Sequence, residues 1–179
     1  EPAVPRALPP GIPSLRVENL SFTYPGSAKP ALQNISFTLA PGQRLGIAGG
    51  VGSGKSTLLA CLARMLPVAP GHIFFSDTDV RDLSLSEVRR RLAFVPQESF
   101  LFSRSLRENV LYGSLETDPN RRTQALATAA RLAAVEADVQ RLPRGFDTVL
   151  GERGSNLSGG QRQRLTIARA IARHPQMML

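Results

Sequence analysis

The feature that most constrains what this chain folds into is one glycine-rich octapeptide. The residues from Gly49 to Ser56 follow the pattern G-x-x-x-x-G-K-[ST]. They stand between an apolar run at residues 45–48, which predicts a buried strand, and residues 56–65, which predict a helix that ends before Pro67. A strand, a glycine-rich turn and a helix in this order predict an α/β fold with a phosphate-binding loop.

The residue types in this phosphate loop suit a nucleoside triphosphate. Glycines let successive backbone N–H groups point at phosphate oxygens, and the helix N-terminus adds partial positive charge. Lys55 is predicted to reach the β- and γ-phosphates, a catalytic role, and the Ser56 hydroxyl is predicted to ligate Mg²⁺. The candidate residues are Gly49, Gly50, Val51, Gly52, Ser53, Gly54, Lys55, Ser56 and Thr57. An ordinary glycine-rich turn is the alternative, and the full match in this context weighs against it.

Composition excludes several classes of protein. The 179 residues suit one domain, and a hydrophobic content of 42% excludes a wholly disordered chain. The lone cysteine, Cys61, excludes an internal disulfide, and no apolar run approaches the ~20 residues of a membrane span. Lys+Arg number 22 against 14 Asp+Glu, and the net charge of +8 would suit nucleic acid. Because the arginines are scattered along the chain, we expect no nucleic-acid partner.

The rest of the chain alternates strands with helices. Five prolines within residues 1–14 predict an extended linker. Strands are predicted at residues 15–22, 35–39, 72–75 and 92–95, helical structure at 104–141 (most clearly 121–142) and at 158–173, and an apolar run at 176–179. This order predicts an α/β core with an all-helical insertion in its second half.

A second motif narrows the family. Leu157-Ser158-Gly159-Gly160-Gln161 by itself predicts a capped helix N-terminus. With the phosphate loop about a hundred residues upstream, it resembles the signature of the nucleotide-binding domain of ATP-binding cassette (ABC) proteins. The resemblance covers residues 15–179. It implies a P-loop NTPase core, with a parallel sheet flanked by helices and an N-terminal antiparallel β part, plus an all-helical ABC subdomain.

The resemblance assigns roles to further residues. Tyr24, about twenty-five residues before the phosphate loop, stands where the family places an aromatic that stacks on adenine; packing on the core is the alternative. Gln97 looks like the Q-loop glutamine that contacts Mg²⁺ and the region of the attacking water, although a glutamine in isolation would be an ordinary loop residue. The signature, residues 157–161, would close over the ATP bound to a second such domain, so the implied cofactors are ATP and Mg²⁺.

Two segments resemble bacterial multidrug-exporter half-transporters. Residues 97–103, with the 106–110 stretch, are similar to that group, and Glu152-Arg153-Gly154 resembles the segment that touches the coupling helices of the membrane domains. Phe100 and Phe102 would then belong to a surface that receives a partner helix. The alternative is that these two rings cover the apolar base of the helical insertion.

The resemblance also divides the chain. It implies a proline-rich linker from a preceding membrane domain (1–14), the first part of the ATP-binding core (15–97), a helical subdomain (98–157), and the signature helix with the start of the next core strand (158–179). In the family, the carboxylates that hold Mg²⁺ and polarise water follow that strand. We assign none of them here, and we expect the 179-residue piece by itself to be poorly stable and nearly inactive.

The implied function is the ATP-binding cassette of an ABC exporter. ATP would be bound and hydrolysed in a head-to-tail dimer, a homodimer or a heterodimer, to drive export through transmembrane domains of the same or a partner chain. The expected location is the cytoplasmic face of the inner (plasma) membrane. Two alternatives stay open: a soluble ABC ATPase that acts on nucleic acid or ribosomes, which the positive charge favours, and a non-catalytic ATP-binding fragment.

Overall fold

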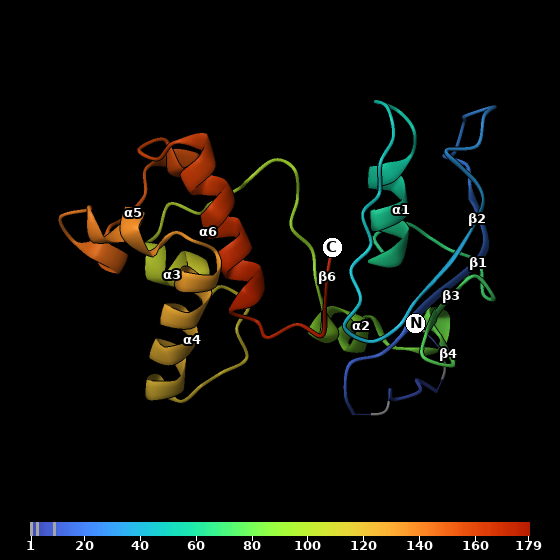
Figure 1. Ribbon diagram of the computed structural model, residues 1–179, viewed down its shortest axis with the longest axis horizontal. Helices are drawn as coiled ribbons and strands as arrows, with labels where there is room; N and C mark the ends of the chain where they lie inside the picture. The colour runs from blue at the N-terminus through green and yellow to red at the C-terminus, as the bar shows by residue number, and fades with distance from the viewer. Residues whose placement is uncertain (1, 3, 9) are drawn as a thin grey trace. The chain divides into compact units, whose positions relative to one another are not determined.

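A computed structural model describes residues 2, 4–8 and 10–179, apart from the side chain of Arg153 (Figure 1). Glu1, Ala3 and Pro9 of the predicted linker lie outside the described residues. The chain separates into two compact units: a first unit of the residues up to Leu92 together with Leu179, and a second unit of residues 93–178.

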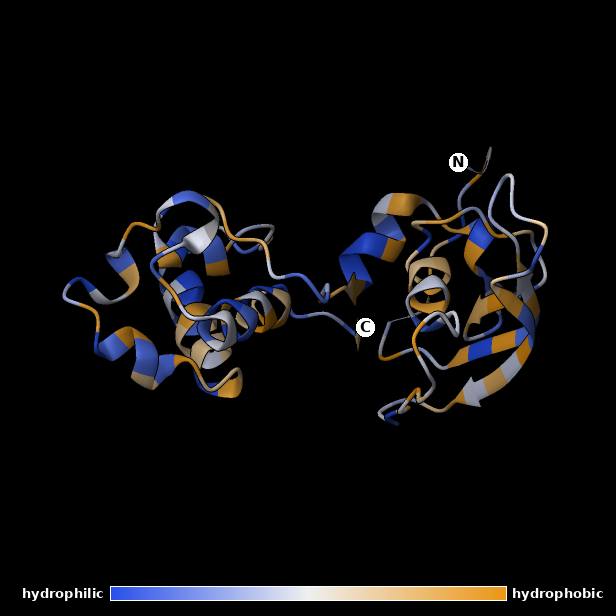
Figure 2. Cartoon of the chain, turned by 90° about the horizontal axis from the view of Figure 1, so that it is seen from above, coloured by the Kyte–Doolittle hydropathy of each residue, from blue (hydrophilic) through white to orange (hydrophobic). Residues whose placement is uncertain are grey.

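The first unit contains a four-stranded antiparallel sheet in the order β2–β1–β3–β4. The strands are β1 (Leu15–Phe22), β2 (Leu32–Leu39), β3 (Ile73–Phe75) and β4 (Thr78–Asp79). In β1, Leu15, Val17 and Leu20 are buried between more exposed residues, which confirms the predicted alternation; Figure 2 shows the resulting hydrophobic and hydrophilic bands on the strands. The extra residue between Val17 and Leu20 coincides with a register shift, where Asn19 has a φ of 46°.

The helix after the phosphate loop is confirmed but is shorter than predicted. It is α1 (Lys55–Leu62), and it ends before Arg64, which has a φ of 51°. A left-handed residue cannot continue a right-handed helix, so the end comes ahead of Pro67. The Arg64 guanidinium donates to the carbonyl of Val80 (3.0 Å), in the short 3-10 helix η1 (Val80–Asp82), and to that of Leu83 (2.6 Å).

The predicted buried strand at residues 45–48 is wrong. These residues belong to no strand, and 47% of Leu45 and 37% of Ile47 are exposed. An apolar run forms a strand only where a neighbouring strand accepts its backbone hydrogen bonds, and no described strand pairs with this segment. The α/β class and its N-terminal antiparallel part are confirmed.

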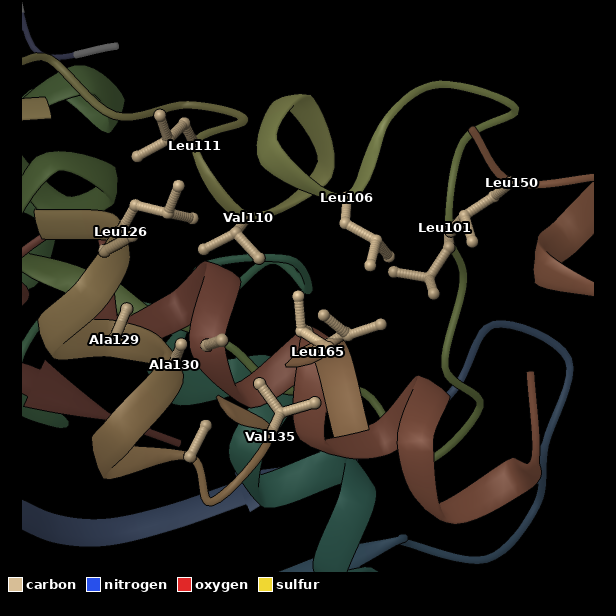
Figure 3. Packing of buried hydrophobic residues seen from close by; sticks show 14 of the residues in the cluster. Leu101, Leu106, Val110, Leu111, Leu126, Ala129, Ala130, Val135, Leu150 and Leu165 are labelled. Carbon is tan, nitrogen blue, oxygen red and sulfur yellow. The ribbon is translucent and has the colours of Figure 1, made fainter. Parts of the chain in front are cut away.

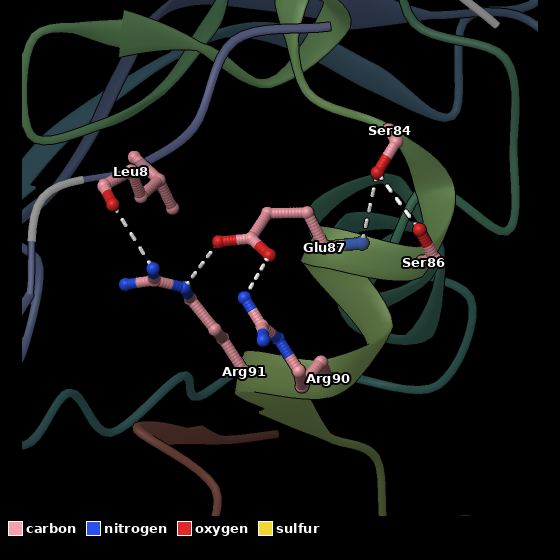
Figure 4. A network of polar contacts seen from close by, with 6 residues as sticks. All are labelled: Leu8, Ser84, Ser86, Glu87, Arg90 and Arg91. Carbon is pink, nitrogen blue, oxygen red and sulfur yellow. Dashed lines mark hydrogen bonds and ion pairs between the residues drawn. The ribbon is translucent and has the colours of Figure 1, made fainter.

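The proline-rich segment is anchored on the first unit. Leu8 is only 5% exposed, and its carbonyl accepts a hydrogen bond from Arg91 (3.0 Å). Arg91 lies in α2 (Leu85–Arg91), a helix that Ser84 caps. The Nε of Arg91 also donates to Glu87 (2.7 Å; Figure 4). Leu8 is therefore part of the core. The predicted role of residues 1–14 as a connection to a preceding domain stays a prediction.

The second unit is mainly helical. Its elements are α3 (Leu106–Val110), α4 (Pro119–Leu132), α5 (Glu136–Gln140) and α6 (Gly159–Ile171), with the 3-10 helices η2 (Gly145–Asp147) and η3 (Glu152–Gly154). Helical structure over 104–141 is confirmed. Within residues 121–142, helix α4 ends before Ala134, which has a φ of 53°, and α5 begins after it. A separate two-stranded sheet pairs β5 (Leu92–Ala93) with β6 (Met177–Met178).

The core of the second unit forms where α3 and α4 pack against α6. Figure 3 shows Val110 of α3 and Ala129 of α4 near Leu165 of α6, and all three are 1% exposed or less. The helix that follows the signature is therefore held by the helical core, which fixes the direction of its N-terminus within this unit.

Candidate nucleotide-binding site

The phosphate loop leads into α1, as the sequence predicts. Gly54 is the N-cap of this helix and has a φ of 88°, a conformation that glycine adopts without strain. A Cβ at this position would stand 2.3 Å from the Ala31 carbonyl oxygen and 3.0 Å from Leu32 Cδ2. Only glycine fits so close to the start of β2, and this close approach determines where the backbone N–H groups of the loop lie.

The Lys55 ammonium is bent back over the loop. Its Nζ donates to the carbonyls of Gly49 (2.8 Å) and Gly50 (2.7 Å) and lies 3.3 Å from Ser53 Oγ. The first turn of α1 carries no acidic residue. The ammonium and the partial positive charge of the helix N-terminus therefore reinforce one another, which suits a chain of phosphates.

Tyr24 lies at the same site. A pocket of about 310 Å³ is lined by Tyr24, Ala31 and the residues from Gly52 to Thr57, within the ~300–1,000 Å³ typical of small-molecule sites. The Tyr24 hydroxyl is 3.1 Å from Thr57 Oγ1, and its ring meets Phe22 edge-on, with centroids 5.0 Å apart. Tyr24 is 42% exposed, so it is not a fully buried residue. The alternative of a core tyrosine does not suit this exposure.

Two residues in or beside this pocket were not predicted to belong to a site. Ala31 forms part of the wall and belongs to no motif, so nothing in the sequence marks it. Phe22 supports Tyr24 from two residues away, and this short aromatic pair was the available signal.

The predicted Mg²⁺ contacts fall in different units. Mg²⁺ takes oxygen ligands, and the exposed Ser56 hydroxyl at the pocket wall suits one coordination position. Gln97 lies in an exposed bend of the second unit, so its contact with the same ion stays a prediction. Among the described residues, no three His, Cys, Asp or Glu side chains gather closely enough to hold a metal ion.

The signature begins α6, as predicted. Ser158 is the N-cap and forms a capping box with Gln161, in which Ser158 Oγ accepts from the Gln161 N–H (3.2 Å) and Gln161 Oε1 accepts from the Ser158 N–H (2.9 Å). Leu157 is buried, whereas Gly159 and Gly160 are exposed at the first two positions of the helix. The buried leucine anchors the motif, and the exposed glycines present backbone N–H groups.

An aromatic cluster occupies the segment that resembles exporters. The rings of Phe100 and Phe102 meet edge-on with centroids 5.2 Å apart, and those of Phe102 and Tyr112 lie 4.5 Å apart. Phe100 is 48% and Tyr112 52% exposed, so the cluster covers the helical unit only in part. Glu152–Gly154 forms η3; the side chain of Arg153 lies outside the described residues.

Asn109 ties this cluster to α6. It is 1% exposed, and its Oδ1 accepts hydrogen bonds from the Phe102 N–H and from Arg169, both at 2.8 Å. Arg169 also donates to the backbone carbonyls of Asn109 (2.8 Å) and Phe100 (2.9 Å), and burial lowers the pKa of its guanidinium. No role was predicted for Asn109, although an amide between the apolar residues of α3 was a usable signal.

The family follows from a comparison with known proteins. The model of the ABC transporter family matches residues 32–179, a span that contains both the phosphate loop and the signature. The chain belongs to the ABC transporter family. The P-loop NTPase fold class that the two motifs implied is thereby confirmed.

The relatives of this ABC chain include exporters. It is 46% identical over 172 residues to the multidrug resistance-like ATP-binding protein MdlA of Escherichia coli (strain K12). It is 41% identical over 165 residues to the ATP-dependent lipid A-core flippase of Aromatoleum aromaticum. These matches cover 96% and 92% of the ABC chain but 28% and 27% of the relatives, so the chain spans little more than a quarter of their length.

The fold of the ABC chain agrees with that of a solved exporter. The structure of a bacterial Atm1-family ABC exporter with ATP bound matches 99% of this chain and 30% of its own, with a TM-score of 0.87 and 35% identity. The predicted resemblance to exporter-type ABC proteins is confirmed. Among the described residues, no helix is both long and apolar enough to span a membrane.

Proposed function

We propose that this chain is the ATP-binding cassette of an exporter, which binds and hydrolyses ATP in a head-to-tail dimer to drive transport across a membrane. The observation that carries the proposal is the pocket in which Tyr24, Lys55 and the glycine-rich loop meet. The exporter part of the proposal is supported by the names of the relatives.

One part of the pocket suits the adenine ring of ATP, and another part suits its phosphates. The adenine ring stacks on the ring of Tyr24, which its hydroxyl contact with Thr57 holds in place. The phosphates enter the phosphate loop, where Lys55 exchanges its contacts with the Gly49 and Gly50 carbonyls for phosphate oxygens. Ser56 would hold Mg²⁺ and Gln97 would contact it, and the ion would neutralise part of the phosphate charge. Gln97 orients the attacking water.

The signature completes the site of a second cassette. Ser158, Gly159 and Gly160 meet the γ-phosphate that is bound to the phosphate loop of the partner, with Leu157 and Gln161 supporting them. Closure then depends on the γ-phosphate, and hydrolysis releases the dimer. The partner cassette belongs to an identical or a different chain.

The second unit carries the motion to transmembrane domains. The exposed rings of Phe100 and Tyr112, together with residues 152–154, form the surface that receives them. In this proposal the cassette would lie at the cytoplasmic face of the inner (plasma) membrane.

Two substitutions test the nucleotide roles in the full-length protein. Lys55→Ala should abolish ATP turnover or strongly weaken ATP binding, because the phosphates lose their ammonium partner, whereas Lys29→Ala, at an exposed residue, should not. Ser158→Arg should leave ATP binding intact and block turnover, because the new side chain occupies the dimer interface. Gln124→Arg, on the exposed face of α4, controls for the added charge. Isothermal titration with ATP and phosphate release measure the two steps, and wild-type turnover in either test variant contradicts the proposal.

A further inference from the structure

The amide of Gln161 is held at both ends. Its Oε1 accepts a hydrogen bond from the Ser158 N–H (2.9 Å), while its Nε2 donates to Asp138 Oδ1 (3.2 Å). Asp138 lies in α5, outside the signature, 23 residues away in the sequence. Because the Ser158 N–H donates and the carboxylate only accepts, both partners select the same orientation of the Gln161 amide.

The second oxygen of Asp138 holds an arginine of α6. Oδ2 accepts from the Arg164 guanidinium at 2.6 Å and 3.2 Å. A Cβ on Gly160 would stand 3.4 Å from Arg164 Nη1, so the guanidinium flanks the backbone of the signature. The hydrogen bonds from Arg164 and Gln161 lower the pKa of Asp138, which keeps the carboxylate ionised at neutral pH.

The capping box determines which donors the signature presents. The Ser158 and Gln161 N–H groups are used within the box, and the Arg162 N–H donates to the Ser158 carbonyl (3.0 Å). Gly159 and Gly160 are the first two residues of α6, where a backbone N–H has no partner within the helix. The capping box therefore orients these two N–H groups and the Ser158 hydroxyl, and Asp138 contacts the box through the Gln161 amide.

We propose that Asp138 is a positioning residue for the signature. It orients the Gln161 amide and keeps the positive charge of Arg164 beside Gly160, so that the glycine N–H groups and the Ser158 hydroxyl face one direction before a phosphate arrives. The inference rests on the proposed function, in which the signature meets the γ-phosphate of a partner cassette. Preorganised donors of this kind act mainly on the reacting state.

The test uses the full-length protein with the nearly isosteric Asp138→Asn. Its kcat should fall about tenfold, the change expected from losing one hydrogen bond to a charged group. The KM for ATP should change by less than about twofold, because the phosphate loop that binds ATP is untouched. The melting temperature should stay at the wild-type value, which separates a positioning role from a structural one.

Asp147→Asn is the matched control. Asp147 also pairs with an arginine, since Arg107 Nε lies 2.9 Å from its Oδ1, but it is 69% exposed and makes no described contact with α6. The kcat of the Asp147→Asn variant should equal that of the wild type. Asp138→Glu, which keeps the charge, should recover part of the lost kcat.

Three results would overturn the inference. They are an unchanged kcat in Asp138→Asn, a fall in kcat accompanied by an equal effect on ATP KM, and a fall accompanied by a lower melting temperature in both Asp138→Asn and Asp138→Glu. Ser158→Arg, measured alongside, separates the two levels of the argument. If it blocks turnover while Asp138→Asn does not, the inference fails and the proposed function stands; if the wild type shows no turnover, both fail.

Discussion

Gly54→Ala tests whether the close approach of the phosphate loop to β2 determines nucleotide binding. The added Cβ would stand 2.3 Å from the Ala31 carbonyl oxygen, whereas ordinary van der Waals contact begins at 3.4 Å. The two backbones must therefore separate by about 1 Å to relieve the overlap. Ala31 is itself held, because its N–H donates to the Phe22 carbonyl at 2.7 Å, so we expect the loop to move.

Two costs determine the size of the effect. An L-residue at positive φ costs about 1–2 kcal/mol. Overpacking a closely packed site costs about 1–3 kcal/mol more. Together they lower the free energy of unfolding by about 2–5 kcal/mol, which lowers the melting temperature of a chain of this size on the order of 10 °C. A loop displaced by about 1 Å also misplaces the phosphates, which costs about a hundredfold in ATP turnover.

Thermal melts followed by circular dichroism, and phosphate release with ATP, both on the full-length protein, measure the two effects. Gly50→Ala is the matched control for folding, because it adds the same methyl group to the same loop and no atom lies within 4 Å of that position. Its melting temperature should stay within about 2 °C of the wild type, as for a surface substitution. A wild-type melting temperature and turnover for Gly54→Ala, or an equal loss of stability for Gly50→Ala, would refute the reasoning.

Two further predictions concern buried groups. Asn109→Ala leaves the Phe102 N–H and the Arg169 guanidinium without their Oδ1 acceptor, so urea titration should show the free energy of unfolding lowered by about 3–5 kcal/mol. An unchanged urea midpoint for Asn109→Ala would contradict the network. Burial raises the pKa of the Cys61 thiol from 9.0 to about 11, so the unfolded chain ionises first and the stability falls as the pH rises from 9 towards 11. The loss should reach about 2–3 kcal/mol near pH 11 and be missing from Cys61→Ala; equal pH slopes in the two proteins would disprove it.

The elements that the sequence predicts well are those with strong local signals. The helix after the phosphate loop and the helix after the signature both appear where glycine, serine and apolar periodicity place them. The Ser158–Gln161 capping box joins residues three apart, so it can be inferred from spacing. The ends of the helices were less predictable, because Arg64 and Ala134 adopt positive φ although neither is glycine.

The predicted strand at residues 45–48 shows the limit of pattern reasoning. Its apolar residues favour a buried strand, yet a strand exists only with hydrogen-bonded neighbours, and apolar character says nothing about which segments supply them. Leu8 shows the opposite case, because it lies among prolines that predict an extended linker and is nevertheless buried.

The sequence by itself determined the chemistry of this protein: a loop of glycines with Lys55 and Ser56, and a capped helix that begins with two glycines. Those properties depend on residues within a few positions of one another, where backbone geometry decides the contacts. The tertiary structure decided which distant groups support them. Tyr24 meets Thr57 from 33 residues away, Asp138 holds Gln161 from 23 away, and neither distance along the chain carries a periodic signal. Such pairs form only when whole helices and strands pack, because packing is what brings remote side chains within hydrogen-bonding distance.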